Sequence, residues 1–160
     1  MIHPSAIIGK NVKLGSNVEI GPYVLIDGNV TIGDNTKIQA SCSITGNTII
    51  GENNTFFSFS SIGSIPQDLK YYGEESYLKI GNSNIFREHC TVNTGTEGGG
   101  YNTIIGNNSL FMTGSHIAHD CIVGNNVIMA NQATLGGHVI IEDNAVIGGL
   151  SAIHQFCRIG

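Results

Sequence analysis

The segment His-Ile-Ala-His-Asp-Cys at residues 116–121 groups side chains that can do chemistry. Histidine and aspartate act as proton acceptors, as oriented pairs and as metal ligands, and cysteine adds a thiol. More histidines follow in Gly-Gly-His-Val at 136–139 and in Ile-His-Gln-Phe-Cys at 153–157. Which chemistry these residues support depends on where each side chain points, and therefore on the elements that carry them.

A large apolar residue recurs at every sixth position along almost the whole chain. The series runs from Ile2 to Ile62, returns from Ile80 to Val92, and continues after a shift of one residue from Ile105 to Ile159, which gives 24 hexads. A smaller residue lies four positions after most of these large ones. Neither the helical period of 3.6 nor the strand period of 2 explains this pattern, which is typical of hexapeptide-repeat solenoids.

The hexad period predicts an all-β fold, a parallel β-helix shaped as a triangular prism. Each hexad forms one side and three form a coil, so 18 residues return to the same face and 24 hexads give about eight coils. Coils stack at strand spacing, about 4.8 Å. Repeats of this type generally wind left-handed, although the sequence does not reveal the hand. Glycines after the large residues, such as Gly9 and Gly15, and the following Asn or Asp are expected at corners that need a positive φ angle.

Residues 1–160 are predicted to form a single repeat domain with two inserted loops, at 68–79 and 98–104, where the period breaks. Such loops collect on one face of a solenoid and often shape its binding site. The sequence ends on the first residues of a new hexad, without a cap for the open end. We therefore expect this sequence to be a piece of a longer protein.

Composition excludes several classes of protein. The net charge is −5, and seven Lys and Arg residues are too few for a nucleic-acid surface. No signal peptide or membrane span is evident, so a cytoplasmic location is expected. All four cysteines fall in the small inward column without a Cys-x-x-Cys spacing, which predicts buried, unpaired thiols.

The 18-residue coil places three chemically useful residues in one column. His119 is followed after 18 residues by Gly137 and after 36 by Gln155. His138 and His154 lie beside this column, and the whole group is predicted to span about 10 Å, or two coil spacings. Asp120 is the neighbour of His119 and lies one coil from His138, so either pairing is open.

Three interpretations compete for this cluster. It is a chance grouping of polar surface residues, a metal site, since imidazoles bind zinc well, or an acyl-transfer site with a histidine base. In the third, the Gly137 N–H can stabilise the oxyanion. We favour acyl transfer and expect no metal and no cofactor.

Four strings resemble one family of hexapeptide-repeat enzymes. They are Ile-Pro-Gln-Asp-Leu-Lys-Tyr-Tyr-Gly-Glu at 65–74, His-Ile-Ala-His-Asp-Cys, Gly-Gly-His-Val, and Gly-Leu-Ser-Ala-Ile-His-Gln-Phe-Cys at 149–157. Together they are similar to the acyl-carrier-protein:UDP-N-acetylglucosamine O-acyltransferases, which catalyse the first step of lipid A synthesis. The resemblance implies transfer of a 3-hydroxyacyl group from acyl carrier protein to the sugar 3-hydroxyl. The acyl chain length and a preference for an amino-sugar acceptor stay open.

The resemblance also implies residue roles. His119 is the general base, Asp120 supports it, and Gly137 is the oxyanion donor. The implied substrate-binding residues are Gln67, Asp68, Lys70, His116, His138, His154 and Gln155.

Members of this family are homotrimers with active sites in the clefts between subunits, so we expect a homotrimer. Full-length members continue with further coils and a helical C-terminal domain, so the resemblance implies that both are missing from this sequence. Its partners are UDP-N-acetylglucosamine and 3-hydroxyacyl-acyl carrier protein. The alternatives are a related hexapeptide N-acyltransferase or acetyltransferase, a metal-binding protein like the γ-carbonic anhydrases, and a non-catalytic solenoid scaffold.

Overall fold

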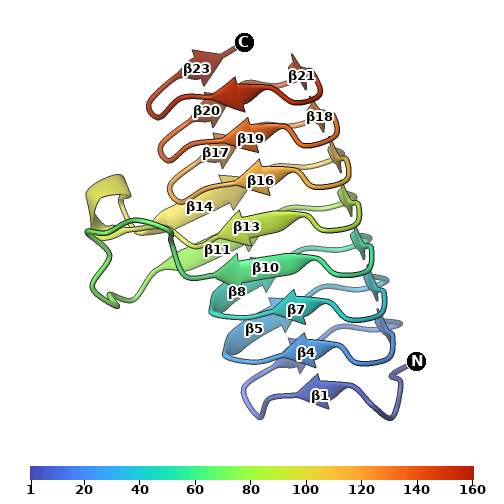
Figure 1. The fold of residues 1–160 in the computed structure, drawn as a ribbon. Coiled ribbons are helices and arrows are strands. Elements are labelled where there is room, and N and C mark those ends of the chain that lie inside the picture. The colour runs from blue at the N-terminus through green and yellow to red at the C-terminus, as the bar shows by residue number, and fades with distance from the viewer.

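The computed structural model describes residues 1–160 as a three-sided, left-handed parallel β-helix with almost no helix (Figure 1). The first sheet contains β1 (Ile7–Ile8), β4 (Leu25–Ile26), β7 (Ser43–Ile44), β10 (Ser61–Ser64), β13 (Thr91–Asn93), β16 (His116–Ile117), β19 (Thr134–Leu135) and β22 (Ala152–Ile153). The second contains β2 (Lys13–Leu14), β5 (Asn29–Ile32), β8 (Asn47–Ile50), β11 (Tyr77–Ile80), β14 (Asn102–Ile105), β17 (Ile122–Val123), β20 (Ile140–Ile141) and β23 (Arg158–Ile159). The third contains β3 (Glu19–Ile20), β6 (Lys37–Ile38), β9 (Thr55–Phe56), β12 (Ile85–Phe86), β15 (Leu110–Phe111), β18 (Ile128–Met129) and β21 (Val146–Ile147).

The strand register confirms the 18-residue coil. Ile8 pairs with Ile26, and Ile117 pairs with Leu135, each across 18 residues. The 23 strands and the bridge between Ile2 and Ile20 account for all 24 predicted hexads. The predicted prism of about eight coils is therefore confirmed.

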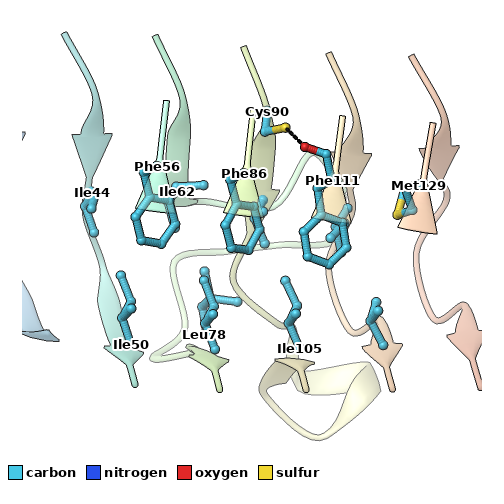
Figure 2. Packing of buried hydrophobic residues seen from close by; sticks show 14 of the residues in the cluster. Ile44, Ile50, Phe56, Ile62, Leu78, Phe86, Cys90, Ile105, Phe111 and Met129 are labelled. Atoms are coloured by element: carbon cyan, nitrogen blue, oxygen red, sulfur yellow. Dashed lines mark hydrogen bonds between the residues drawn. The ribbon is translucent and has the colours of Figure 1, made fainter. Parts of the chain in front are cut away.

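The large residue of each hexad points into the prism and forms one continuous core. Phe56, Phe86 and Phe111 are fully buried on successive coils of the third sheet. Their rings stack with centroid distances of 4.9 and 4.7 Å, which match the strand spacing (Figure 2). Such stacks add about 0.5–1.5 kcal/mol per pair to the gain from burial. The coils are thus locked in register by the same residues that exclude water.

The corners correct one expectation about glycine. Positive φ angles occur at the third residue after the large apolar one, as at Asn17 and Asn35, and not at Gly9 or Gly15. Those glycines serve a different purpose, because a Cβ at Gly33 would lie 2.6 Å from the Gly51 carbonyl carbon of the next coil. The prediction that the Asn positions take positive φ is correct, whereas the glycines after the large residues allow backbones to approach closely.

Two inserted loops interrupt the coils at 65–76, between β10 and β11, and at 94–101, between β13 and β14. The expected ranges 68–79 and 98–104 ran too far, since 77–79 and 102–104 already belong to β11 and β14. The reason is that these strands have four paired residues, whereas the hexad pattern marks only the last one. The second loop contains a 3-10 turn, η1 (Glu97–Gly99). Both loops leave the same corner, between the first and second sheets, and project together (Figure 1).

Three of the four cysteines are buried, as predicted, but Cys157 is exposed. It occupies the inward column of the last described coil, where no further coil packs on it. The expectation of a fourth buried thiol is therefore wrong. No helix in the structure is long and apolar enough to cross a membrane.

Candidate active site

The corner between the first and second sheets carries the predicted column. His119 follows β16, Gly137 follows β19 and Gln155 follows β22. Backbone hydrogen bonds link the coils here, because His138 N donates to His119 O at 3.0 Å and Phe156 N donates to Gly137 O at 3.2 Å. The predicted stacking of these positions is therefore confirmed.

Gly137 lies directly against the His119 ring. A Cβ atom at residue 137 would be 2.4 Å from His119 Cε1 and 2.6 Å from Nε2. The Gly137 N–H donates to no acceptor among the hydrogen bonds of the chain. A bare backbone donor thus stands beside an imidazole, as an oxyanion site beside a base requires.

His119 and Asp120 form a buried pair. His119 Nδ1 lies 2.7 Å from Asp120 Oδ2, and the two residues are only 4% and 6% exposed. An ionised carboxylate accepts only, so the imidazole donates through Nδ1 and keeps its Nε2 lone pair free to take a proton. Asp68 Oδ2, in the first inserted loop, lies 3.9 Å from this Nε2.

Both pairings that the sequence left open for Asp120 occur. Besides the bond from His119, Asp120 Oδ2 lies 3.7 Å from His138 Nε2. The two imidazole rings meet edge to face, with centroids 5.1 Å apart. His138 in turn stacks on Phe156, with centroids 4.5 Å apart and planes 9° from parallel.

The geometry of this group favours a hydrogen bond over metal ligation. One donor atom each from His119, Asp120 and His138 lies within 4.8 Å of the others. Two ligands of a tetrahedral zinc ion at its usual bond lengths are roughly 3.3 Å apart. The 2.7 Å between His119 Nδ1 and Asp120 Oδ2 is shorter than that and is normal for a charge-assisted hydrogen bond.

The inserted loops bury this corner. Thr96 in the second loop donates its backbone N–H to Asp120 Oδ1 at 2.7 Å and its hydroxyl to Oδ2. The first loop is tied to the second, since Tyr72 Oη donates to Glu97 Oε2 at 3.2 Å and Glu97 N donates to Glu74 Oε1 at 3.2 Å. The two loops therefore act as one wall beside the His119–Asp120 pair.

A pocket of about 360 Å³ opens between the loops and the next coils. Asp68, Lys70 and Glu74 line it from the first loop, and His138 and Phe156 line it from the coils above. It brings carboxylates, an ammonium group, an imidazole and an aromatic ring around one space. Such a mixture suits a polar ligand with both hydroxyl and anionic groups.

The remaining predicted site residues lie further out. Gln67, His154 and Gln155 are exposed. His116 is half-buried on the outer side of β16, where its Nδ1 lies 2.7 Å from Thr91 Oγ1. Burial lowers the pKa of His116 below its ordinary value, and the nearby His119 lowers it further, so His116 is neutral at neutral pH.

Sequence reasoning missed Thr96 and Phe156. Phe156 lies 18 residues after His138, so the coil rule that found the first column also predicts this one. Thr96 lies in a loop without periodicity, and no sequence signal points from it to Asp120.

Two families of repeats match the chain. The bacterial transferase hexapeptide repeat matches residues 102–137, and the hexapeptide repeat of succinyl-transferase matches residues 5–46. Among relatives, the acyl-[acyl-carrier-protein]–UDP-N-acetylglucosamine O-acyltransferase of Aliarcobacter butzleri is 56% identical over 99% of this chain and 61% of its own length. The enzyme of the same name from Janthinobacterium sp. is 51% identical over 100% of this chain and 61% of its own length.

Solved structures agree with these relatives. LpxA from Acinetobacter baumannii superimposes with a TM-score of 0.97 and is 49% identical, with 98% of this chain and 61% of that one covered. UDP-N-acetylglucosamine acyltransferase from Francisella novicida gives a TM-score of 0.98 at 40% identity, covering 100% and 58%. The chain thus spans about 61% of the length of the relatives it matches. With this identity over its whole length, the chain belongs to the family of acyl-[acyl-carrier-protein]–UDP-N-acetylglucosamine O-acyltransferases.

Proposed function

We propose that this chain carries the site that moves a 3-hydroxyacyl group from acyl carrier protein to the 3-hydroxyl of UDP-N-acetylglucosamine, in lipid A biosynthesis. The observation that carries the proposal is the buried His119–Asp120 pair, which lies against Gly137 at the edge of a polar pocket. The relatives named for this reaction supply the substrate class.

His119 acts as the general base. Its Nε2 removes the proton of the sugar hydroxyl as the hydroxyl oxygen attacks the thioester carbonyl carbon. The Asp120 carboxylate, held on Nδ1, keeps the required tautomer and balances the charge of the imidazolium that forms. The imidazolium then returns the proton to the departing thiolate, so the base is regenerated and protons balance.

Gly137 stabilises the oxyanion through its backbone N–H. Its N–H is unused by the chain, and the residue lies against the His119 ring, so we assign this N–H to the oxygen of the tetrahedral intermediate. A single donor of this kind typically contributes 10²–10³-fold to the rate.

The pocket residues bind the sugar nucleotide. Asp68 Oδ2, 3.9 Å from His119 Nε2, accepts a hydrogen bond from a second sugar hydroxyl next to the attacking one, whose own proton goes to Nε2. Lys70 in the same pocket provides positive charge for the diphosphate. His138 also lines this pocket, and the remaining sugar-nucleotide contacts are assigned in the proposal to Gln67, His116, His154 and Gln155.

The assembly is a homotrimer in a cytoplasmic location. Side chains on the outer side of the third sheet are apolar on four successive coils. They are Ile85, Leu110, Ile128 and Val146. A flat apolar face of this kind suits packing between copies around a threefold axis. A monomer in sedimentation or mass photometry at micromolar concentration contradicts this part of the proposal.

The decisive assay uses the protein encoded by the gene that carries this sequence. Transfer from a 3-hydroxyacyl carrier protein to UDP-N-acetylglucosamine is expected, and His119→Ala is expected to lower kcat by about 10²–10⁴-fold. His89→Ala is the matched control, because His89 is also a corner imidazole but follows β12 on another edge of the prism.

Two results contradict the proposal. One is near-normal turnover of His119→Ala. The other is transfer only to amino-sugar acceptors or from acyl-coenzyme A, which instead identifies a related N-acyltransferase or acetyltransferase.

A further inference from the structure

The Asp120 carboxylate is the most tightly held polar group of the site. Its side chain is 1% exposed, and both oxygens receive hydrogen bonds from Thr96, at Oδ1 from the backbone and at Oδ2 from the hydroxyl. Thr96 itself is 5% exposed and lies outside the repeat, in the second inserted loop. Thr96 does not itself take part in the proposed proton transfer.

We propose that Thr96 is a positioning residue, which fixes the Asp120 carboxylate and through it the ring orientation and tautomer of His119. The inference rests on the proposed function only where it concerns the rate, because the orientation of His119 is measurable without any substrate.

The first argument concerns competition for one oxygen. Asp120 Oδ2 lies 2.7 Å from His119 Nδ1 and 3.7 Å from His138 Nε2, so two imidazoles approach it from neighbouring coils. A carboxylate free to turn about its Cβ–Cγ bond can serve either ring. The two bonds from Thr96 hold both oxygens at once and thereby fix the plane of the carboxylate in the orientation that serves His119.

The second argument concerns the backbone below the carboxylate. Asp120 has a positive φ of 62°, as residues at the same corner position have on other coils. Asp120 N donates to Thr103 Oγ1 at 2.9 Å, at the start of β14. The second loop therefore hydrogen-bonds to the Asp120 carboxylate, and β14, which follows this loop, hydrogen-bonds to the Asp120 backbone.

The third argument concerns Gly99, at the end of η1. A Cβ at residue 99 would lie 2.1 Å from Asp120 Cγ and 2.3 Å from Oδ1. Only glycine lets the loop close on the carboxylate at this distance. The residues from Thr96 to Gly99 thus pack together against the Asp120 side chain.

The other charged or titratable groups near the pair do not replace Thr96. Asp68 and His116 approach His119, and His138 approaches Asp120. Asp68 cannot donate to a carboxylate when ionised, and His138 competes with His119. Apart from His119 Nδ1–H, the Thr96 hydroxyl is the one hydrogen-bond donor on Asp120 Oδ2.

The test compares Thr96→Val, which removes the hydroxyl but keeps the shape and the N–H, with Thr96→Ser, which restores a hydroxyl. Thr94→Val is the matched control. Thr94 is also a buried threonine of this loop, 3% exposed, and its hydroxyl accepts from Ser76 Oγ at 2.9 Å, away from Asp120. Gly99→Ala is a second, independent variant, since it disturbs the same carboxylate while Thr96 stays intact.

The first measurement is the ¹⁵N NMR spectrum of the His119 ring at mildly alkaline pH. We expect the Nδ1–H tautomer alone in the wild type, in Thr96→Ser and in Thr94→Val, and a mixture of tautomers in Thr96→Val and Gly99→Ala. Thermal unfolding of each variant shows that the comparison is made between folded proteins.

The second measurement is steady-state acyl transfer. Thr96→Val is expected to lower kcat about tenfold, which corresponds to about 1.4 kcal/mol, with the KM for UDP-N-acetylglucosamine within about twofold. Thr96→Ser should recover most of this loss, and Thr94→Val should match the wild type.

An unchanged tautomer in both Thr96→Val and Gly99→Ala overturns the inference. Equal losses in Thr96→Val, Thr96→Ser and Thr94→Val also overturn it, because they indicate a general role in loop folding. If the wild type transfers no acyl group, the proposed function fails, while the NMR comparison still decides the role of Thr96.

Discussion

Gly137→Ala offers a direct test of how the coil register builds the site. The substitution adds one methyl group and leaves the backbone N–H in place, so the proposed oxyanion donor is retained. Gly137 does not have a positive φ, and alanine is therefore compatible with its backbone. Any large effect must come from what the methyl group meets.

The methyl group meets the base. The new Cβ would lie 2.4 Å from His119 Cε1, whereas non-bonded carbon atoms are normally about 3.5 Å apart. The imidazole must therefore retreat by about 1 Å, against the hydrogen bond that Asp120 makes to Nδ1. A misplacement of about 1 Å at a catalytic group costs on the order of 10²-fold in rate. We expect kcat to fall by about that factor while the protein stays folded.

Gly149→Ala is the matched control. Gly149 has the same place in its hexad as Gly137, two residues after a large apolar residue, but follows β21 on another edge. A Cβ there would lie 3.4 Å from Asn131 O, which is an ordinary contact. The assay is steady-state acyl transfer to UDP-N-acetylglucosamine, with thermal unfolding of both variants. Wild-type kcat in folded Gly137→Ala would refute the reasoning, because it would mean that the base does not act from the position that stacks on Gly137.

Four further predictions concern charge, packing, thiol reactivity and the pH dependence of stability. Asp120→Asn should lower kcat at least 10²-fold in the transfer assay, since a neutral amide no longer enforces the Nδ1–H tautomer or balances the imidazolium; a loss below tenfold contradicts this. Phe86→Ala should lower the free energy of unfolding by about 3–5 kcal/mol in urea titrations, because the middle ring of the buried stack is lost; a loss under 1 kcal/mol contradicts this. At pH 8 a thiol reagent should leave Cys90 and Cys121 unmodified in the folded protein and react with them after unfolding, because burial raises the pKa of these two to about 12. For the same reason the part of the free energy of unfolding that depends on these two thiols should be constant below about pH 9 and fall as the pH rises toward 12, since the unfolded thiols ionise first; a stability that is constant from pH 9 to pH 11 contradicts this.

The repeat could be predicted closely from the sequence because one physical rule governs it. Each coil buries one large residue per side, so the positions of Ile20, Ile38 and Phe56 specify the sheet, the face and the register together. The column that joins His119 to Gly137 follows from that rule and needs no knowledge of side-chain contacts. The error over glycine had a physical origin too, since a tight corner and a close approach between coils both favour glycine.

The covering loops could not be predicted in the same way. Residues 65–76 and 94–101 have no period, and their shapes depend on contacts such as that of Tyr72 with Glu97. The burial of Asp120 by Thr96 is therefore absent from any sequence pattern.

The site depends on both the repeating coils and the non-repeating loops, and neither is sufficient alone. A strict solenoid would align an imidazole with a bare backbone N–H at its corner, but that corner would be open to water, where two charges attract weakly. The inserted loops leave the two coils that precede His119 in the chain and cover this corner. The Asp120 side chain is therefore only 1% exposed. At the low dielectric constant of this buried corner, the hydrogen bond between His119 and Asp120 is electrostatically stronger than it would be in water, so the ring orientation is held more firmly. The repeating residues thus supply the register between the proposed base and the proposed oxyanion donor, and the non-repeating residues supply the burial of the Asp120 carboxylate that holds this base.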